Sequence, residues 1–288
     1  MPELAEVRLT ADYVNQTSKG KVFTQVDKNP THKGEEVQLP FQQFQLYAES
    51  RGKELVLYVL EQGGIDSIPI RMTMGMSGHF QMTPTGQEVK HSHLMFRSTD
   101  DLTLSFVDMR RFGKWKLGQE WSSNRGPDPV RETDAFMANI MENLDKRAFD
   151  KPIHEMLMNQ QYFNGIGNYL RAEILHRLPH VNPFMSAREA IELEPKIFHL
   201  CKAIPELAYI LGGGKLKSWE NPLGEEAATP QTRRDMFQCY NQPGMSKIKD
   251  KSGRTFWYDP KWDRLDIDTE WDHYSGLPNP KAYEKINQ

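Results

Sequence analysis

Apolar and polar residues follow two different periodicities along the chain, and the periodicity changes near the middle of the chain. The clearest early segments, 53–60, 68–82, 91–97 and 102–117, alternate with a period of two, and turn-rich stretches such as 62–64 and 98–101 separate them. This pattern is typical of antiparallel strands. Before them, Val7, Ala11 and Val14 predict a helix from residue 4 to residue 14. The first part of the chain is therefore predicted to be an antiparallel β sandwich with an N-terminal helix.

The second part has helical spacing instead. Amphipathic stretches cover 134–144, 151–158, 169–177 and 187–211, with prolines at their starts and stops. Between the two parts, residues 121–131 have the Pro, Gly and Asn content of a linker. We therefore predict an α+β protein. Its β-sandwich domain would cover 1–125, its helical domain 126–262, and a loosely held acidic tail 263–288.

Composition excludes several classes of protein. Two cysteines among 288 residues, Cys201 and Cys239, are too few for a four-cysteine zinc site or a disulfide framework, and we expect both to be buried. His154 lacks the second histidine that a zinc-protease helix needs, and His91 and His93 are predicted to lie on the surface of a strand. No metal and no cofactor is expected. No apolar run is long enough to span a membrane, and no leader pattern precedes the first helix.

The charge is unevenly distributed. The net charge is -3, yet residues 231–262 carry seven bases against three acids, and the tail from residue 263 carries six acids against three bases. Two short apolar-alternating segments lie in this basic stretch, on either side of residues 251–254, and predict a β hairpin. A basic hairpin favours a polyanionic partner in spite of the acidic total.

The stretch QQYFNGIGNYLRAEIL at 160–175 predicts two helices joined by a glycine hairpin. Gly165 and Gly167 allow backbone angles closed to other residues, and Asn168 follows at a favoured N-cap position. The exposed N–H groups of such a helix start form a site for a phosphate. Taken alone, the same stretch favours the helix hairpin of an ordinary core.

The chain opens with Met1, Pro2 and Glu3. We expect Met1 to be removed, which leaves a secondary amine that can attack an aldehyde-like carbon and form an iminium ion. Glu3 could then move protons. The same residues would also open an ordinary helix, because proline and acidic residues suit a first turn.

Several of these motifs together resemble the formamidopyrimidine-DNA glycosylase and endonuclease VIII family. The residues Gln160, Gly165, Gly167, Asn168 and Glu173 fit the QxxxxGxGNxxxxE pattern of its helix-two-turn-helix motif. The opening PELAEV is similar to the family's PELPEV, with Ala5 in place of the second proline. The resemblance implies that Pro2 is the nucleophile, that Glu3 is the general acid/base, and that Glu6 supports them.

The resemblance extends to other segments of the chain. Arg51 to Leu55 is similar to the family's RGKxL strand, so Lys53 would be a catalytic lysine that reaches the phosphate and the sugar of the target nucleotide. Met76, Arg110 and Phe112 align with the residues that fill the void left by a flipped base. Considered without the resemblance, Met76 and Phe112 would be assigned to the core.

The last matches lie in the C-terminal part. Lys215, after a run of three glycines, would contact the lesion from a loop that closes over the flipped base. Residues 236–260 resemble the zincless finger of the endonuclease VIII-like branch, and its arginine, Arg254, would bind phosphate together with Lys53 and Asn168. With one cysteine, the finger is expected to hold by packing of Phe237, Tyr240, Phe256 and Trp257.

The resemblance implies a bifunctional DNA glycosylase/AP lyase of base excision repair. It would excise oxidised pyrimidines, formamidopyrimidines and hydantoins through a Pro2 Schiff base and cleave the strand by β,δ-elimination. The expected partner is damaged DNA, double-stranded or single-stranded, bound by a monomer inside the cell, in the nucleus or the nucleoid. Two alternatives remain from the residues: a non-catalytic helix-two-turn-helix nucleic-acid-binding protein, and a small-molecule tautomerase that uses Pro2 alone.

Overall fold

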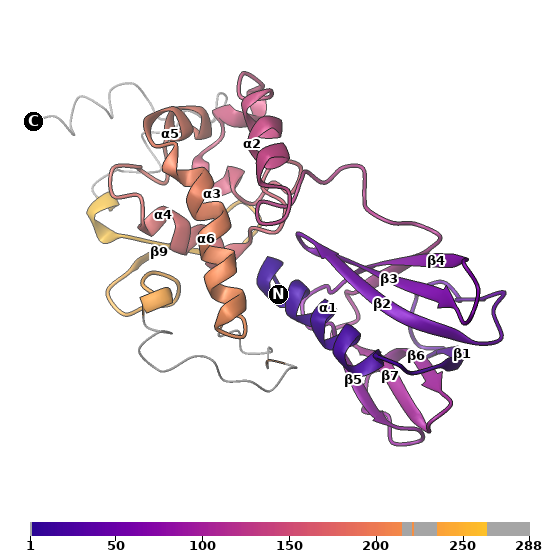
Figure 1. Ribbon diagram of the computed structural model, residues 1–288. Helices are drawn as coiled ribbons and strands as arrows, with labels where there is room; N and C mark the ends of the chain where they lie inside the picture. The colour runs from indigo at the N-terminus through magenta and orange to yellow at the C-terminus, as the bar shows by residue number, and fades with distance from the viewer. Residues whose placement is uncertain (1, 215–220, 222–234, 264–288) are drawn as a thin grey trace, which may run out of the picture. The chain divides into compact units, whose positions relative to one another are not determined.

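The structure, a computed structural model, describes residues 2–214, 221 and 235–263 (Figure 1). Lys215 and the tail from residue 264 lie outside the described residues. The chain divides into two compact units. The first consists of Met1–Ser123 and Gly212–Ala227, and the second of Asn124–Leu211 and Ala228–Gln288, so far as these ranges are described. No described helix has the length and hydropathy of a membrane span.

The first unit begins with helix α1, Leu4–Ser18, which runs four residues beyond the predicted end. Val7, Ala11 and Val14 are buried, as their spacing predicts. The start of the helix is held by its own first turn, where the backbone N–H of Glu3 donates to Glu6 Oε2 at 2.8 Å. An acid at this position also interacts favourably with the positive end of the helix dipole.

Eight strands form the sheet of the first unit, and all of its strand pairs are antiparallel. They are β1 (Phe23–Lys28), β2 (Phe44–Arg51), β3 (Glu54–Glu61), β4 (Ser67–Thr73), β5 (His79–Pro84), β6 (Ser92–Ser98), β7 (Leu102–Val107) and β8 (Lys114–Leu117). Their order is β5-β7-β6-β1-β2-β3-β4-β8. The two longest predicted segments, 68–82 and 102–117, are each broken by a turn, at Gly75 (φ +58) and at Arg111 (φ +55).

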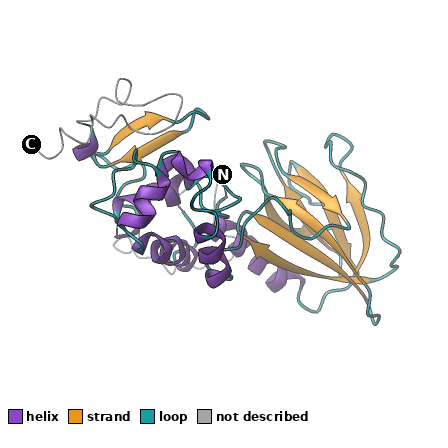
Figure 2. Ribbon diagram, turned by 90° about the horizontal axis from the view of Figure 1, so that it is seen from above, coloured by secondary structure: helices purple, strands orange, loops and turns teal. Residues whose placement is uncertain are grey.

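The sheet curls so that its two halves face each other: β2, β3 and β4 lie opposite β5, β6 and β7 in Figure 1, and the two layers overlap in the view from above in Figure 2. β1 and β2 join the halves through one register pair, Phe23 with Phe44. Phe106 on β7 packs edge-on against Trp115 on β8, with ring centroids 6.1 Å apart, although these strands stand near opposite ends of the strand order. Buried residues from both halves fill the space between them. The predicted β sandwich is confirmed.

Helix α1 lies along the sandwich and is tied to both halves (Figure 1). Asn15 makes two hydrogen bonds with the backbone of Ala48 on β2, at 2.7 and 2.9 Å. The hydroxyl of Tyr13 accepts from the backbone N–H of Met82 on β5 at 2.9 Å. These contacts fix where the N-terminal residues emerge on the first unit.

The second unit consists of short helices and one hairpin. The helices are α2 (Thr133–Met141), α3 (Ile153–Met156), α4 (Asn168–His176), α5 (Ala187–Leu193) and α6 (Lys196–Ile210), with 3-10 turns at Arg147–Asp150 and Pro260–Trp262. Strands β9 (Ser246–Lys249) and β10 (Thr255–Tyr258) form the predicted hairpin. The predicted helix 187–211 is two helices, because Pro195 disfavours helical geometry at the residue before it.

One predicted surface residue is buried. His93 is 2% exposed, and its Nε2 donates to the backbone oxygen of Asp108 at 2.9 Å. The loop between β1 and β2 covers it, since His32 from that loop packs 4.8 Å from the His93 ring and stacks on Trp115 at 4.3 Å. Strand alternation alone could not reveal this cover. Cys201 and Cys239 are buried as predicted, and burial raises the pKa of Cys239 to about 12.

A buried carboxylate, Asp108, ties together the two turns that interrupt the predicted strands. Its Oδ1 accepts from Ser77 Oγ at 2.5 Å and from the backbone N–H of Arg110 at 3.2 Å. Its Oδ2 accepts from the backbone N–H of Gly113 at 2.7 Å. The turns are tightly packed, because a Cβ on Gly75 would stand 2.5 Å from the backbone nitrogen of Gly113. Asp108 therefore fixes the 74–78 turn and the 108–113 turn as one body.

Replacing Asp108 with alanine is expected to lower the free energy of unfolding by about 2–4 kcal/mol, because buried donors on both turns lose a charged acceptor. Asp108→Asn, which keeps one oxygen, should cost less. Urea denaturation of the two variants would measure both values. Asp66→Ala, in an exposed loop of the same unit, is the matched control and should stay within about 0.5 kcal/mol of the parent. Equal stability of Asp108→Ala and the parent would contradict this role.

Candidate active site and nucleic-acid interface

Glu6 joins the N-terminus of the chain to a glycine loop 208 residues away in sequence. Its side chain is fully buried, with Oε2 accepting from the backbone N–H of Glu3 at 2.8 Å and Oε1 from that of Gly214 at 2.5 Å. Pro2 and Glu3 are buried beside it on the chain. The candidate nucleophile and acid are thereby held at a fixed distance from the loop that leads to Lys215.

Lys53 lies in the turn of the β2–β3 hairpin and is 9% exposed. The pair Arg51 and Glu54 closes the ladder on either side, and Gly52 adopts a left-handed φ of +58°, which a residue with a side chain rarely allows. The geometry of the turn therefore explains why a glycine precedes Lys53. Lys53 is thus a buried turn lysine and not a solvated one on a strand edge.

The candidate void-filling residues project from the two turns that Asp108 connects. Met76 is 36% exposed and Phe112 is 53% exposed, so neither is a core residue. The guanidinium of Arg110 lies 5.2 Å from the centre of the Phe112 ring, a cation–π contact. The structure therefore brings an apolar side chain, an aromatic ring and a guanidinium together on a rigid base. Such a set could fill a gap in a base stack.

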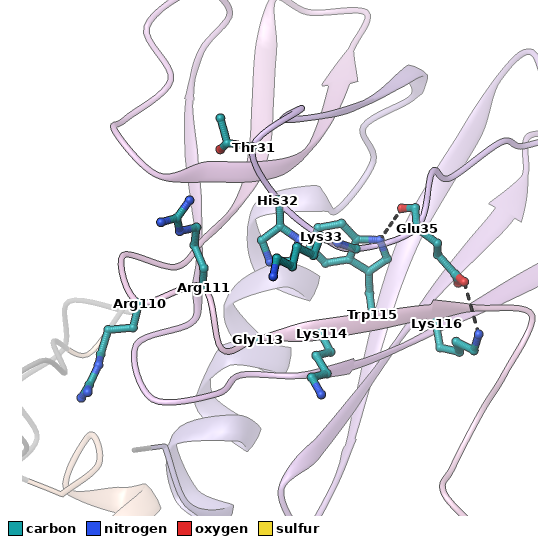
Figure 3. A pocket seen from close by; sticks show the side chains of 11 residues that line it. Thr31, His32, Lys33, Glu35, Arg110, Arg111, Gly113, Lys114, Trp115 and Lys116 are labelled. Atoms are coloured by element: carbon teal, nitrogen blue, oxygen red, sulfur yellow. Dashed lines mark hydrogen bonds and ion pairs between the residues drawn. The ribbon is translucent and has the colours of Figure 1, made fainter.

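Beside these turns lies a basic groove of about 660 Å³ (Figure 3). The charged residues that line it are Lys33, Glu35, Arg110, Arg111, Lys114 and Lys116. Five bases against one acid leave an excess of four positive charges, and the acid, Glu35, is paired with Lys116 at 3.5 Å. Burial and the neighbouring His93 lower the pKa of His32, which keeps the imidazole in the groove wall neutral.

Sequence reasoning missed Lys33 and Lys114. They stand far apart in the chain and belong to no motif, and only the folding of the β1–β2 loop over Trp115 brings them together. A signal did exist, since Gly34 must pass close to an aromatic ring: a Cβ there would stand 2.4 Å from Trp115. The sequence does not say which ring that is.

The glycine hairpin of the second unit is built around Gln160. Its amide donates to the backbone oxygens of Met158 and Ile166, at 3.0 and 2.9 Å, and its Oε1 accepts from the backbone N–H of Gly165 at 3.0 Å. Gly165 has a φ of +96°, which explains why a glycine stands at this position. One side chain thus pairs three backbone groups of the turn.

Asn168 is the first residue of α4, and its N-cap is Gly167 instead. The Asn168 side chain therefore does not cap the helix. Its Nδ2 donates to the backbone oxygen of Thr255 in the hairpin at 2.8 Å, and its Oδ1 accepts from Arg171. The Asn168 side chain therefore contacts the residue that follows Arg254 in the hairpin.

The hairpin packs through alternate residues. Phe256 and Tyr258 face inward and are buried, whereas Trp257 faces outward and lies under Lys247 Nζ at 5.2 Å. Trp257 is half-buried and packs against Lys247 on the other face of the hairpin, because neighbouring strand residues point to opposite faces. Arg254 is exposed, and its backbone N–H donates to Asp250 Oδ1 at 2.9 Å. No cluster of metal-ligating side chains occurs among the described residues.

Comparison with known proteins relates both units to repair enzymes. The model of the formamidopyrimidine-DNA glycosylase N-terminal domain matches residues 1–115, and that of the endonuclease VIII-like 1 DNA-binding region matches residues 234–262. Endonuclease 8-like 1 of Homo sapiens is 36% identical over 287 residues, covering 90% of this chain and 72% of that protein. The corresponding protein of Mus musculus is 37% identical with the same coverage.

Solved structures show the same fold. MutM (Fpg) from Thermus thermophilus superposes with a TM-score of 0.73 at 24% identity, covering 91% of this chain and 98% of that one. MutM in complex with DNA containing carbocyclic 8-oxo-G gives a TM-score of 0.71 at 23% identity, covering 92% and 100%. Neither a tautomerase nor a simple helix-two-turn-helix binder accounts for similarity on this scale. The chain belongs to the formamidopyrimidine-DNA glycosylase and endonuclease VIII family, in its zincless-finger branch, and is a DNA glycosylase with AP lyase activity.

Proposed function

We propose that Pro2, Glu3 and Lys53 carry the chemistry of this base excision repair glycosylase. The observation that carries the proposal is the Glu6 carboxylate, which accepts from both Glu3 and Gly214 and so holds the N-terminus against the loop before Lys215. A nucleophile and an acid need fixed geometry relative to the nucleotide that they attack. Glu6 provides it without taking part in bond breaking.

The reaction proceeds through a covalent intermediate between Pro2 and the sugar. The Pro2 nitrogen, free once Met1 is removed, attacks C1′ of the damaged nucleotide, and the base leaves with the glycosidic electron pair and a proton. Glu3 moves the protons that base loss and sugar ring opening require. The resulting iminium withdraws electrons, so loss of a C2′ proton expels the 3′ phosphate and a second elimination expels the 5′ phosphate. Water then releases the sugar fragment from Pro2. Lys53 contacts the phosphate and the sugar.

The substrate proposed is DNA with an oxidised pyrimidine, a formamidopyrimidine or a hydantoin. Flipping such a base costs a few kcal/mol of stacking. Met76, Arg110 and Phe112 would fill the gap from their rigid base, and Lys215 would contact the flipped base. Asn168 and Arg254 bind the flanking phosphates, with Lys53. We place the protein inside the cell, in the compartment that holds the genome.

The substitution Pro2→Ala is expected to abolish covalent trapping. A duplex with one oxidised pyrimidine, incubated with the protein and borohydride, should give a cross-link to the N-terminal peptide of the parent and none in the variant, while binding affinity is kept. Peptide mass spectrometry locates the adduct. Pro40→Ala, in an exposed loop, serves as control and should trap like the parent. Strand cleavage by Pro2→Ala at the parent's rate would refute the assignment.

Arg254→Ala is expected to weaken binding to every lesion alike, because a phosphate contact carries no base information. The slope of log K against log salt should become shallower by about 0.9 for the loss of one phosphate contact. Fluorescence anisotropy across a salt titration would measure it. Arg188→Ala, whose guanidinium is paired with Asp150 in the same unit, is the control and should leave the slope unchanged. A lesion-dependent effect of Arg254→Ala would argue against phosphate binding.

The basic groove is proposed to bind the sugar–phosphate backbone near the void-filling turns. Lys33→Ala/Lys114→Ala should therefore make the salt slope shallower by up to about 1.8, the value for two phosphate contacts. Base excision from saturating DNA should remain within about twofold, since neither lysine belongs to the proposed catalytic group. Lys90→Ala, outside the groove, provides the comparison. An unchanged slope in the double variant would remove the groove from the interface.

A further inference from the structure

Helix α4 sends a charged side chain, Arg171, into the base of the hairpin, and the proposed chemistry does not use it. Arg171 is fully buried. Its guanidinium forms an ion pair with Asp250 Oδ2 at 2.8 Å and lies 4.9 Å from the centre of the Phe256 ring. It also donates to the backbone oxygen of His154 at 3.0 Å. Burying a cation costs desolvation free energy, and its partners offset that cost only when they are well placed.

One partner of Arg171 is a proposed phosphate ligand. The guanidinium donates to Asn168 Oδ1 through two nitrogens, at 2.6 and 3.1 Å. This fixes the orientation of the amide, because the oxygen must face Arg171 and the nitrogen must face the hairpin. There, Nδ2 donates one hydrogen to the backbone oxygen of Thr255 at 2.8 Å. An amide nitrogen carries two hydrogens, and the second suits a phosphate oxygen.

A second partner of Arg171, Asp250, organises the turn that carries Arg254. While Asp250 Oδ2 faces Arg171, its Oδ1 accepts from the backbone N–H groups of Ser252 and Arg254, both at 2.9 Å. The backbone N–H of Asp250 donates to the oxygen of Arg254 at 2.9 Å. The Asp250 side chain is only 5% exposed. Burial raises the pKa of this carboxyl, but the hydrogen bonds from Arg254 and Arg171 outweigh it, so that the pKa is lowered overall and the charge is kept.

We infer that Arg171 and Asp250 are a positioning pair that sets Asn168 and the Arg254 turn in a fixed relation to each other. The pair links one helix to one hairpin by directional hydrogen bonds, as a bound metal does by coordination. Neither residue touches DNA in this role. The inference rests on the proposed phosphate contacts of Asn168 and Arg254, and it assigns to this pair the geometry that those contacts need.

A double-mutant cycle on the full chain tests the inference. The probe is a duplex with a tetrahydrofuran abasic-site analogue, and the readout is the salt slope of binding. Asp250→Asn keeps an oxygen for the turn and removes the charge that orients Arg171. We expect Asp250→Asn to make the slope shallower by about 0.9, as Arg254→Ala does, and Asp250→Asn/Arg254→Ala to be no shallower than either alone.

Two further variants keep the test decisive. Arg171→Lys retains the charge but not the planar fork, so it should reproduce the shallower slope even if Asp250→Asn does not fold. Asp150→Asn breaks a half-buried ion pair with Arg188 in the same unit and is the matched control, expected to change thermal stability without changing the slope. Thermal melts of every variant separate loss of folding from loss of positioning.

The outcomes distinguish the inference from the function on which it rests. If Arg254→Ala flattens the slope while Asp250→Asn and Arg171→Lys lower only the melting temperature, the pair is merely structural and the inference is overturned. Additive losses in the double variant would overturn it as well. If Arg254→Ala leaves the slope unchanged, the phosphate role of Arg254 fails, and the inference falls with it.

Discussion

Buried carboxylates that accept backbone N–H groups hold three of the segments that are proposed to meet DNA. Glu6 holds the N-terminus, Asp108 the void-filling turns, and Asp250 the Arg254 turn. Glu173 accepts from the three consecutive N–H groups of residues 238–240 at the base of the hairpin, at 2.7 to 3.0 Å. Turns leave N–H groups without helix or sheet partners, and leaving one unpaired in a core is costly. In each of these turns a charged acceptor pairs the N–H groups. Functional residues can therefore stand on loops and still be held rigidly.

The finger shows what replaces coordination when metal ligands are missing. Zinc gathers a small domain by binding side chains from separate segments. Here α4 does so through two buried charges, Arg171 toward the turn at Asp250 and Glu173 toward residues 238–240. The arrangement has its own pH limit. Because the pKa of Asp250 is lowered in the fold, its contribution to stability is present above its ordinary pKa of about 3.9 and is lost as the pH falls through the lowered value. At neutral pH the pair is fully charged.

The sequence predicted those features that local periodicity or a contiguous motif encodes. The helix at Leu4, the strand alternation, the Gly165 hairpin and the buried cysteines all follow from near neighbours in the chain. What it could not predict depends on residues distant in sequence. His93 is buried because a loop from before β2 covers it, and the basic groove exists because Lys33 and Lys114 meet there. Motifs marked residues that are proposed to touch DNA or carry chemistry, whereas the residues that hold them, such as Asp108 and Arg171, carry no signature of their own.

The acidic net charge of the chain is compatible with a polyanionic partner because electrostatic attraction acts locally. At physiological ionic strength a charge is screened beyond about 8 Å, so a phosphate responds to the groove or the hairpin and scarcely to the total. The groove has four excess positive charges, although the whole chain has a net charge of -3. In the hairpin, the acid nearest Arg254 in the chain is Asp250, and it is already paired with Arg171. Burying the local acid in an ion pair removes its repulsion from the surface while keeping its hydrogen bonds, so one residue both shapes the turn and leaves the turn positive.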